Sequence, residues 1–148
     1  MRIALGSDER TALTDDLAAE LVARGHHVTT FGALAGADPA WTATARALAQ
    51  AVASGAFDQG ILCCWTGTGV SIAANKIPGV RAALCADAAT AAGAREWNDA
   101  NVLCLSLRAT SLAVGREILD AWFAGSPTTD AGYAEMIEDL KNADSSER

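Results

Sequence analysis

The 148-residue sequence lacks a surplus of positive charge and has no long apolar run. Lys and Arg number 11 against 18 Asp and Glu, which gives a net charge of −7. Nucleic-acid backbones are bound mainly through Lys and Arg, so this balance argues against a nucleic-acid partner. No apolar run approaches the roughly 20 residues of a membrane span, and the opening MRIALGSDER has no apolar core of a secretory signal. We expect a cytoplasmic protein that binds neither nucleic acid nor membrane.

The four cysteines form no C-x-x-C pair, and they are few for a disulfide framework. A thioredoxin-type site or a zinc knuckle therefore has little support, and disulfides are rare in the cytoplasm. Cys85 and Cys104 lie within apolar runs, where a free cysteine behaves as a small hydrophobic residue. We expect neither a metal nor another cofactor.

Short apolar runs alternate with segments of helical spacing along the chain. The runs have the length and composition of buried strands, and they are RIAL (2–5), HVTTF (27–31), QGILC (59–63), VRAAL (80–84) and NVLCL (101–105). The helical spacing predicts six helices, which begin at Thr14, after an Asp38 cap with Pro39 as first helical residue, near Val70, at Asp87, at 110 and at 130. The last of these is expected to end at 141.

This alternation predicts an α/β fold with a single doubly wound, five-stranded parallel sheet and helices on both faces. We expect one domain over residues 1–142 and a disordered tail over 143–148. Ligands of such sheets bind beyond the carboxyl ends of the strands, where the strand order reverses. The loops that follow the strands are therefore the places to look for a site.

The loop after the third strand reads CWTGTGVS and combines a thiol with a glycine-rich turn. Gly67 and Gly69 allow the backbone N–H groups to turn inward, and the next helix adds its positive end, so an anion can bind here. The loop matches neither G-x-x-x-x-G-K-[ST] nor the complete G-x-G-x-x-G pattern. Cys64 precedes these donors, which favour a thiolate that can act as base or nucleophile. A buried structural cysteine is the alternative.

Other loops offer polar side chains. Asp8 follows the first strand and can accept hydrogen bonds from a polyhydroxylated ligand or move a proton, although a solvated turn carboxylate is the alternative. Asn98 follows the fourth predicted helix and can equally be a turn residue. Arg108 follows the fifth strand at the ligand-binding end of the sheet, whereas Arg81 begins the fourth strand at the opposite end and is expected to be structural.

Two stretches carry a family resemblance: GILCCWTGTGVSIAANKIPGVRAALC (60–85) and AREWNDANVL (94–103). Together with GSD (6–8), they closely resemble the ribose-5-phosphate isomerase B / galactose-6-phosphate isomerase family, and the order of elements fits as far as residue 123. The resemblance implies a flavodoxin-like fold and a dimer, or a pair of dimers, with active sites at the subunit interface. It also implies cofactor-free interconversion of aldoses and ketoses through an enediolate.

The resemblance assigns roles to residues of both loops. Cys64 falls where the family places the base that carries a proton between adjacent carbons, and Thr66 falls where the family stabilises the oxyanion. The backbone donors from Gly67 through Thr68 to Gly69 fall at the same place. An enediolate needs a base at carbon and preorganised donors at oxygen. The implied substrate contacts are those of Asp8, Asn98 and Arg108.

The sequence also departs from the family pattern. Glu9 and Trp97 stand where the family has histidines, the second of them assigned to opening the furanose ring. Trp65 replaces a glycine, and Trp41 stands at the position of an aromatic residue that follows a proline. A C-terminal segment with two arginines is missing, and GSPTTDAGYAEMI (125–137) stands there instead.

The departures predict a changed substrate. Tryptophan does not exchange a proton at ordinary pH, so Trp97 cannot assist ring opening. We expect an open-chain sugar of the tetrose or pentose class, free or phosphorylated, rather than mainly ribose 5-phosphate. Glu9 and the three tryptophans are expected near the strand ends, where they contact the substrate and make the pocket smaller and drier; core packing is the alternative for each tryptophan. Arg108 alone clearly survives of the family's phosphate-binding cations.

The favoured hypothesis is an aldose–ketose isomerase that uses Cys64 as base. The alternative is a non-catalytic protein that binds a sugar or an anion and retains the isomerase fold, although binding alone needs no thiol at this place. Redox sensing through Cys63 and Cys64 is disfavoured, because adjacent strand residues face opposite ways.

Overall fold

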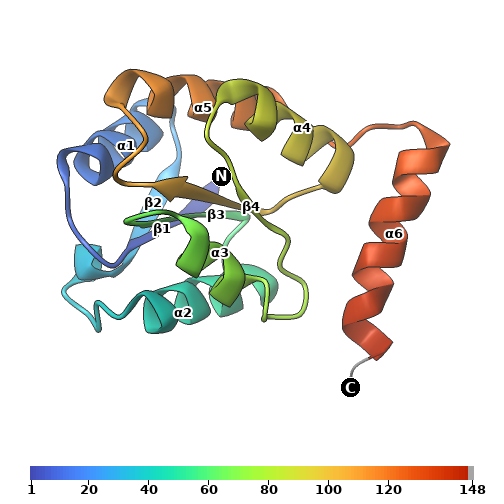
Figure 1. Ribbon diagram of the computed structural model, residues 1–148, viewed down its shortest axis with the longest axis horizontal. Helices are drawn as coiled ribbons and strands as arrows, with labels where there is room; N and C mark the ends of the chain where they lie inside the picture. Colours follow the sequence, from blue (N-terminus) through green and yellow to red (C-terminus); the bar gives the residue numbers. More distant parts are fainter. Residues whose placement is uncertain (147–148) are drawn as a thin grey trace.

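A five-stranded, all-parallel sheet forms the centre of the computed structural model, which describes residues 1–146 (Figure 1). The strand order is β2-β1-β3-β5-β4. The strands are β1 (Arg2–Ser7), β2 (His27–Gly32), β3 (Gln59–Cys64), β4 (Ala82–Leu84) and β5 (Val102–Ser106). The predicted doubly wound sheet is confirmed, and every predicted strand lies within two residues of an observed one.

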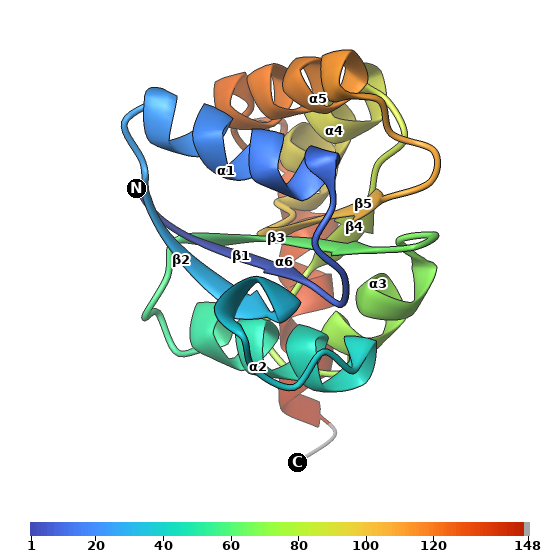
Figure 2. The same cartoon turned by 90° about the vertical axis from the view of Figure 1, so that its left-hand side faces the viewer.

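The helices cover both faces of the sheet. They are α1 (Ala12–Ala23), the short 3₁₀ helix η1 (Ala33–Ala35), α2 (Trp41–Ala53), α3 (Thr68–Ala74), α4 (Ala88–Asn98), α5 (Leu112–Ala124) and α6 (Ala131–Ser146). Figure 2 shows α1, α4 and α5 on one face and α2 and α3 on the other. In Figure 1, α6 stands beside the layered body. None of the described helices is long and apolar enough to cross a membrane.

Two apolar cores result from the alternation of side chains along the buried strands. Cys63 belongs to the core beneath α1, α4 and α5, whereas Cys64 belongs to the core beneath α2 and α3. Successive side chains of a strand point to opposite faces, so the two adjacent thiols are separated by the sheet. This arrangement confirms the expected opposite orientation of the pair.

Helix starts differ from the predicted ones where a neighbouring residue makes the better cap. Thr11 caps α1 by accepting a hydrogen bond from the backbone of Thr14, and Thr14 returns the interaction as the third helical residue. Helix α2 begins at Trp41, because Asp38 accepts from Ala40 N at 2.9 Å and holds a turn ahead of the helix. The predicted starts at Thr14 and after Asp38 are therefore wrong by two or three residues.

The prediction of a disordered tail from residue 143 is wrong for 143–146, which continue α6. Two long-range contacts hold this end of the helix. Asp144 Oδ2 accepts from the backbone N–H of Gly79 at 2.6 Å, and Lys141 Nζ lies 3.1 Å from Asp99 Oδ2. Such contacts cannot be inferred from local composition. The predicted tail residues 147–148 lie outside the described residues.

Candidate active site

Three strands end side by side at one edge of the sheet. Ser7 at the end of β1 pairs with Cys63, and Cys64 at the end of β3 pairs with Ser106 of β5. Strand β2 pairs with one side of β1 and β3 pairs with the other side, so the direction in which strands are added reverses between β1 and β3. Such a switch point is where open α/β sheets bind ligands, and the loops with Asp8, Cys64 and Arg108 meet there.

The two cysteines of β3 differ in their surroundings. Burial raises the pKa of Cys63 to about 12, and the neighbouring Cys64 and Asp8 add to this effect. A thiol of this kind stays protonated in the core at physiological pH. Cys64 ends the strand on the opposite face, with 5% of its surface exposed, directly before the glycine-rich loop.

Hydrogen bonds to β5 and its loop fix the backbone that follows Cys64. Cys64 O accepts from Leu107 N at 2.9 Å, and Trp65 O accepts from both Arg108 N at 3.1 Å and Ser106 Oγ at 3.0 Å. The exposed indole of Trp65 consequently projects from a rigid loop. These bonds position Cys64 without engaging its thiol.

Gly67 directs the loop into α3. Its φ of 77° is left-handed, and a methyl group there would lie 2.5 Å from Leu84 Cδ1. Thr66 Oγ1 and Thr68 Oγ1 are 2.8 Å apart, at the start of the helix. No side chain caps α3, so the N–H groups of its first turn are donors for a ligand.

Asp8 occupies the neighbouring loop. Ser7 Oγ donates to Glu9 O at 2.6 Å and accepts from Glu9 N at 3.2 Å, which closes a tight turn around Asp8. Asp8 Oδ1 is buried and has no hydrogen-bond partner among the described residues. Burial raises the pKa of Asp8, an effect opposed by a hydrogen bond from its own backbone and increased by the charge of Glu9. The carboxyl group is therefore available to a bound ligand.

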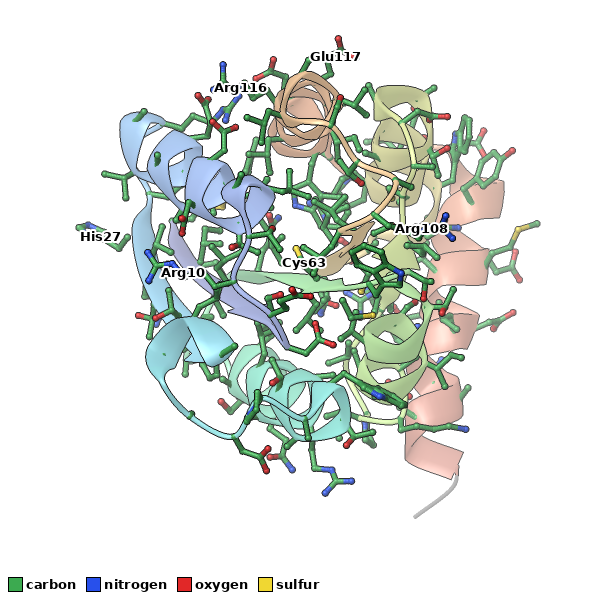
Figure 3. All side chains as sticks on the ribbon, turned by 60° about the vertical axis from the view of Figure 1, so that its left-hand side comes forward. Arg10, His27, Cys63, Arg108, Arg116 and Glu117 are labelled. Carbon is green, nitrogen blue, oxygen red and sulfur yellow. The ribbon has the colours of Figure 1, made fainter. Side chains whose placement is uncertain are left out.

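Trp41 and Arg108 border this edge of the sheet. Trp41 begins α2, and a methyl group on Gly69 would lie 3.0 Å from its ring. With 44% of its surface exposed, Trp41 is not a core residue, and the alternative of core packing is wrong. Arg108 is exposed beyond the end of β5, whereas Cys63 lies inside the sheet (Figure 3).

Trp97 and Asn98 lie near the amino ends of the strands, whereas Cys64 lies at a carboxyl end. This corrects the expectation that Trp97 stands near the carboxyl ends, where the sequence predicts the ligand site. Helix α4 runs back across the sheet after β4, so its last turn lies at the amino ends of β4 and β5. Asp99 follows and contacts Arg81, which directly precedes β4. Within one chain the structure thus brings Asp8, Glu9, Trp41, Arg108 and the loop 64–69 together, and it does not bring Trp97 or Asn98 to them.

An open cavity of about 590 Å³ runs between β4, the edge strand of the sheet, and α4. Leu84, Gly93, Trp97 and Asn98 line it, and Leu84 also contacts the backbone of Gly67. Beside it, the ring of Tyr133 in α6 stacks on Trp97, with centroids 6.4 Å apart. The sequence analysis did not predict a role for Tyr133. The available signal was an aromatic residue in a predicted helix that is otherwise rich in charged residues.

The chemistry available at the carboxyl edge is proton transfer on a small polar molecule. A thiol, a carboxyl group with an unpartnered oxygen and a turn with uncapped backbone N–H groups follow one another at the ends of the neighbouring strands β1 and β3. A base beside preorganised donors can remove a proton from carbon and stabilise the resulting oxyanion. Within residues 1–146, His, Cys, Asp and Glu side chains nowhere gather in threes that could hold a metal ion.

Similarity to known proteins agrees with this chemistry. Residues 3–140 match the model of a family described as Ribose/Galactose Isomerase. Ribose-5-phosphate isomerase B of Escherichia coli is 40% identical over 138 residues, covering 93% of this chain and 92% of that protein. D-erythrulose-4-phosphate isomerase of Pectobacterium atrosepticum is 36% identical, covering 95% and 93%. The solved ribose-5-phosphate isomerase B of Clostridium thermocellum has a TM-score of 0.91 at 34% identity over the full length of both chains.

Proposed function

The chain belongs to the ribose/galactose isomerase family, and from this membership and the residues around Cys64 we propose an aldose–ketose isomerase that acts on a short, open-chain sugar or sugar phosphate. The substrate has four or five carbons, and ribose 5-phosphate is not the main one. The single observation that carries the proposal is that Cys64 ends the strand next to β1, directly before a turn with uncapped backbone N–H groups, while Asp8 directly follows β1 with an unpartnered carboxyl oxygen.

In the proposed reaction, the Cys64 thiolate removes the proton from the carbon next to the carbonyl group. The electron pair moves onto the carbonyl oxygen and gives an enediolate, which Thr66 and the N–H groups of Gly67 through Gly69 stabilise. Asp8 moves the hydroxyl proton between the two oxygens. Cys64 then returns its proton to the adjacent carbon, so that no cofactor is needed.

The size of the substrate is inferred from the departures from the family pattern. Trp97 cannot exchange a proton and so cannot open a sugar ring, whereas a tetrose that carries a substituent at its end has no stable ring to open. A relative of similar length is named for a four-carbon substrate, D-erythrulose 4-phosphate. Arg108 supplies one cation for a terminal anionic group, and the backbone donors of α3 can share it.

We propose further that the chain works as a homodimer, or as a pair of dimers, in the cytoplasm. Asn98 and Trp97 can reach the Cys64 loop only from a second copy, because they lie at the other edge of the sheet in their own chain. Large apolar side chains remain exposed around them, and these are Trp97, Leu84, Tyr133, Met136 and Leu140. An exposed apolar surface of this kind is typical of an interface.

Deuterium exchange tests the activity directly. The protein is incubated in deuterated water with four- to six-carbon aldoses and ketoses, free and phosphorylated, and NMR follows deuterium at C1 and C2. We expect exchange with tetrose derivatives that is abolished by Cys64→Ala and retained by Cys63→Ala, the matched thiol on the opposite face. Ligand-induced stabilisation without exchange would instead establish a binding protein, and a strong preference for ribose 5-phosphate would contradict the substrate assignment.

A further inference from the structure

The backbone of α4 ends in an unusual conformation directly after Trp97 and Asn98. Asp99, at φ 46° and ψ 43°, is the one residue other than glycine with positive φ in the part of the chain that the structure describes. Glycine fills this position of a helix C-terminus most readily, because it has no Cβ. Aspartate and asparagine are the other residues that visit this conformation, and an aspartate here places a carboxylate directly after α4.

The carboxylate of Asp99 joins three elements. Its Oδ2 lies 3.2 Å from Arg81 NH2 and 3.1 Å from Lys141 Nζ, and its Oδ1 lies 3.4 Å from Arg95 NH1. The carbonyl oxygen of Asp99 also accepts from Arg81 Nε at 2.8 Å. One carboxylate is thus held by a residue that precedes β4, by α4 itself and by α6.

The arginines connect Asp99 to fixed parts of the fold. Arg95 NH1 donates to Ala100 O at 2.5 Å, and its guanidinium lies 5.5 Å from the centroid of the buried Trp122 ring. Arg95 and Arg81 keep 11% and 15% of their side chains exposed, so both ion pairs are shielded from water. Shielded pairs hold a geometry more firmly than surface pairs do.

Lys141 provides the third connection, from a helix that otherwise makes few contacts with the body. Its side chain is 40% exposed, and it reaches Asp99 Oδ2 from α6. The stacking of Tyr133 on Trp97 is the second contact between α6 and the end of α4. The direction of the segment 97–98 is therefore set from both sides, by the core and by α6.

We propose that Asp99 is a positioning residue that orients Asn98 and Trp97 toward the substrate of the isomerase. The inference rests on the proposed function, since it takes these two side chains to contact the sugar. The carboxylate of Asp99 fixes the last turn of α4 through Arg81, Arg95 and Lys141, and Asn98, the last residue of that turn, lines an open cavity.

Replacement by glycine separates this role from simple helix capping. Asp99→Gly relieves the backbone strain and removes the clamp, whereas Asp99→Asn keeps the size and the tolerance of positive φ and removes only the charge. Lys141→Gln removes only the ion pair between α6 and Asp99. Arg116→Gln is the matched control, because Arg116 forms an exposed ion pair with Asp16 between α5 and α1 (Figure 3).

Kinetics with the sugar that exchanges provide the first measurement. We expect Asp99→Gly to raise KM about tenfold with a smaller change in kcat, since a misplaced contact weakens substrate binding. Lys141→Gln is expected to raise KM less, and Arg116→Gln to leave it unchanged. In the double variant Asn98→Ala/Asp99→Gly, KM should be little higher than in Asn98→Ala alone, because the two changes remove the same contact with the substrate. An unchanged KM in Asp99→Gly, or full additivity with Asn98→Ala, would overturn the proposal.

Acrylamide quenching of Trp97 fluorescence provides a measurement that does not depend on activity. The Trp97 signal is obtained by subtracting the emission of matched Trp97→Phe variants. Quenching should change in Asp99→Gly, in Asp99→Asn and, to a smaller degree, in Lys141→Gln, but not in Arg116→Gln. If the wild type exchanged no sugar, the proposed function would fail while this measurement still decided whether Asp99 orients the end of α4. Identical quenching in all variants would refute that role.

Discussion

The indole of Trp97 in α4 stacks on the phenol ring of Tyr133 in α6, with centroids 6.4 Å apart and planes inclined at 26°. Both residues stand where the sequence departs from the family pattern that it resembles: that pattern leads us to expect a histidine at Trp97 and an arginine-containing segment at 125–137, which here holds Tyr133. Two departures that are far apart in the sequence therefore form a single contact. The two rings form one aromatic surface between α4 and α6.

Removing the Tyr133 ring should loosen Trp97. Aromatic pairs contribute about 0.5–1.5 kcal/mol beyond their buried area, so we expect Tyr133→Ala to raise KM and to weaken the near-ultraviolet circular dichroism of the tryptophans. Tyr133→Phe keeps the ring and should behave like the wild type in both respects. A Tyr133→Phe variant as impaired as Tyr133→Ala would show that the hydroxyl group, rather than the stacking, matters.

The raised pKa of Asp8 predicts that the stability of the protein depends on pH. Burial raises its pKa, and Glu9 adds to the shift. A carboxyl whose pKa is raised by folding contributes stability that is present below its unfolded value of about 3.9 and is lost as pH rises through the folded value. Asp8→Asn removes this loss, so its melting temperature relative to the wild type should increase between about pH 4 and pH 7. Thermal unfolding across this range measures it.

Asp58 offers a control of opposite sign. A hydrogen bond from Arg2 lowers the pKa of Asp58 to about 2. The stability from this pair is present above the unfolded pKa and is lost as pH falls toward the folded one. The effect of Asp58→Asn should accordingly stay constant between about pH 4 and pH 7 and diminish in stronger acid. A parallel pH response of the two variants would contradict the assignment for Asp8.

Most of the carboxyl-edge site could be predicted from the sequence. The apolar runs indicate buried strands. Because the strands are parallel, the loops that follow them lie on the same side of the sheet, so the sequence predicts that Asp8 and Cys64 lie close together. Trp97 could not be placed in the same way, because the direction in which α4 returns across the sheet decides its edge. The helical residues 143–146 could not be predicted either, since they are held by Asp144 on the distant Gly79.

Thiol modification should distinguish the four cysteines. Burial raises the pKa of Cys63 to about 12 and that of Cys85 to about 11, and it raises the pKa of Cys104 strongly, so these thiols stay protonated and inert. We expect iodoacetamide to label Cys64 first, with a parallel loss of isomerase activity, and the exchanging sugar to protect it. Mass spectrometry of Cys64→Ala and Cys63→Ala checks the site: labelling should disappear in the former only.

Arg108 should determine whether the substrate carries an anionic group. Hydrogen bonds between charged groups contribute about 1.5–3 kcal/mol, so Arg108→Gln is expected to raise KM at least about tenfold for a phosphorylated tetrose. The KM of the free sugar should change little. Kinetics with each phosphorylated and free pair measure the difference, and added salt should reduce it. Equal effects on both sugars would place the anionic group away from Arg108.

Gly67 and Gly69 should differ in their tolerance of a methyl group, although both lie in the same loop. At Gly67 a methyl group would meet Leu84 at 2.5 Å and the backbone of Leu105 at 2.9 Å, in a left-handed conformation, so Gly67→Ala should cost about 1–3 kcal/mol of stability and nearly all activity. At Gly69 the three nearest atoms would all belong to the ring of Trp41, from 3.0 Å. Gly69→Ala should therefore lose less stability and activity than Gly67→Ala. Adding Trp41→Phe to Gly69→Ala should restore part of the lost activity. Denaturant unfolding and exchange rates of the three variants check this order, and a Gly67→Ala variant as active as the wild type would remove the loop from the catalytic site.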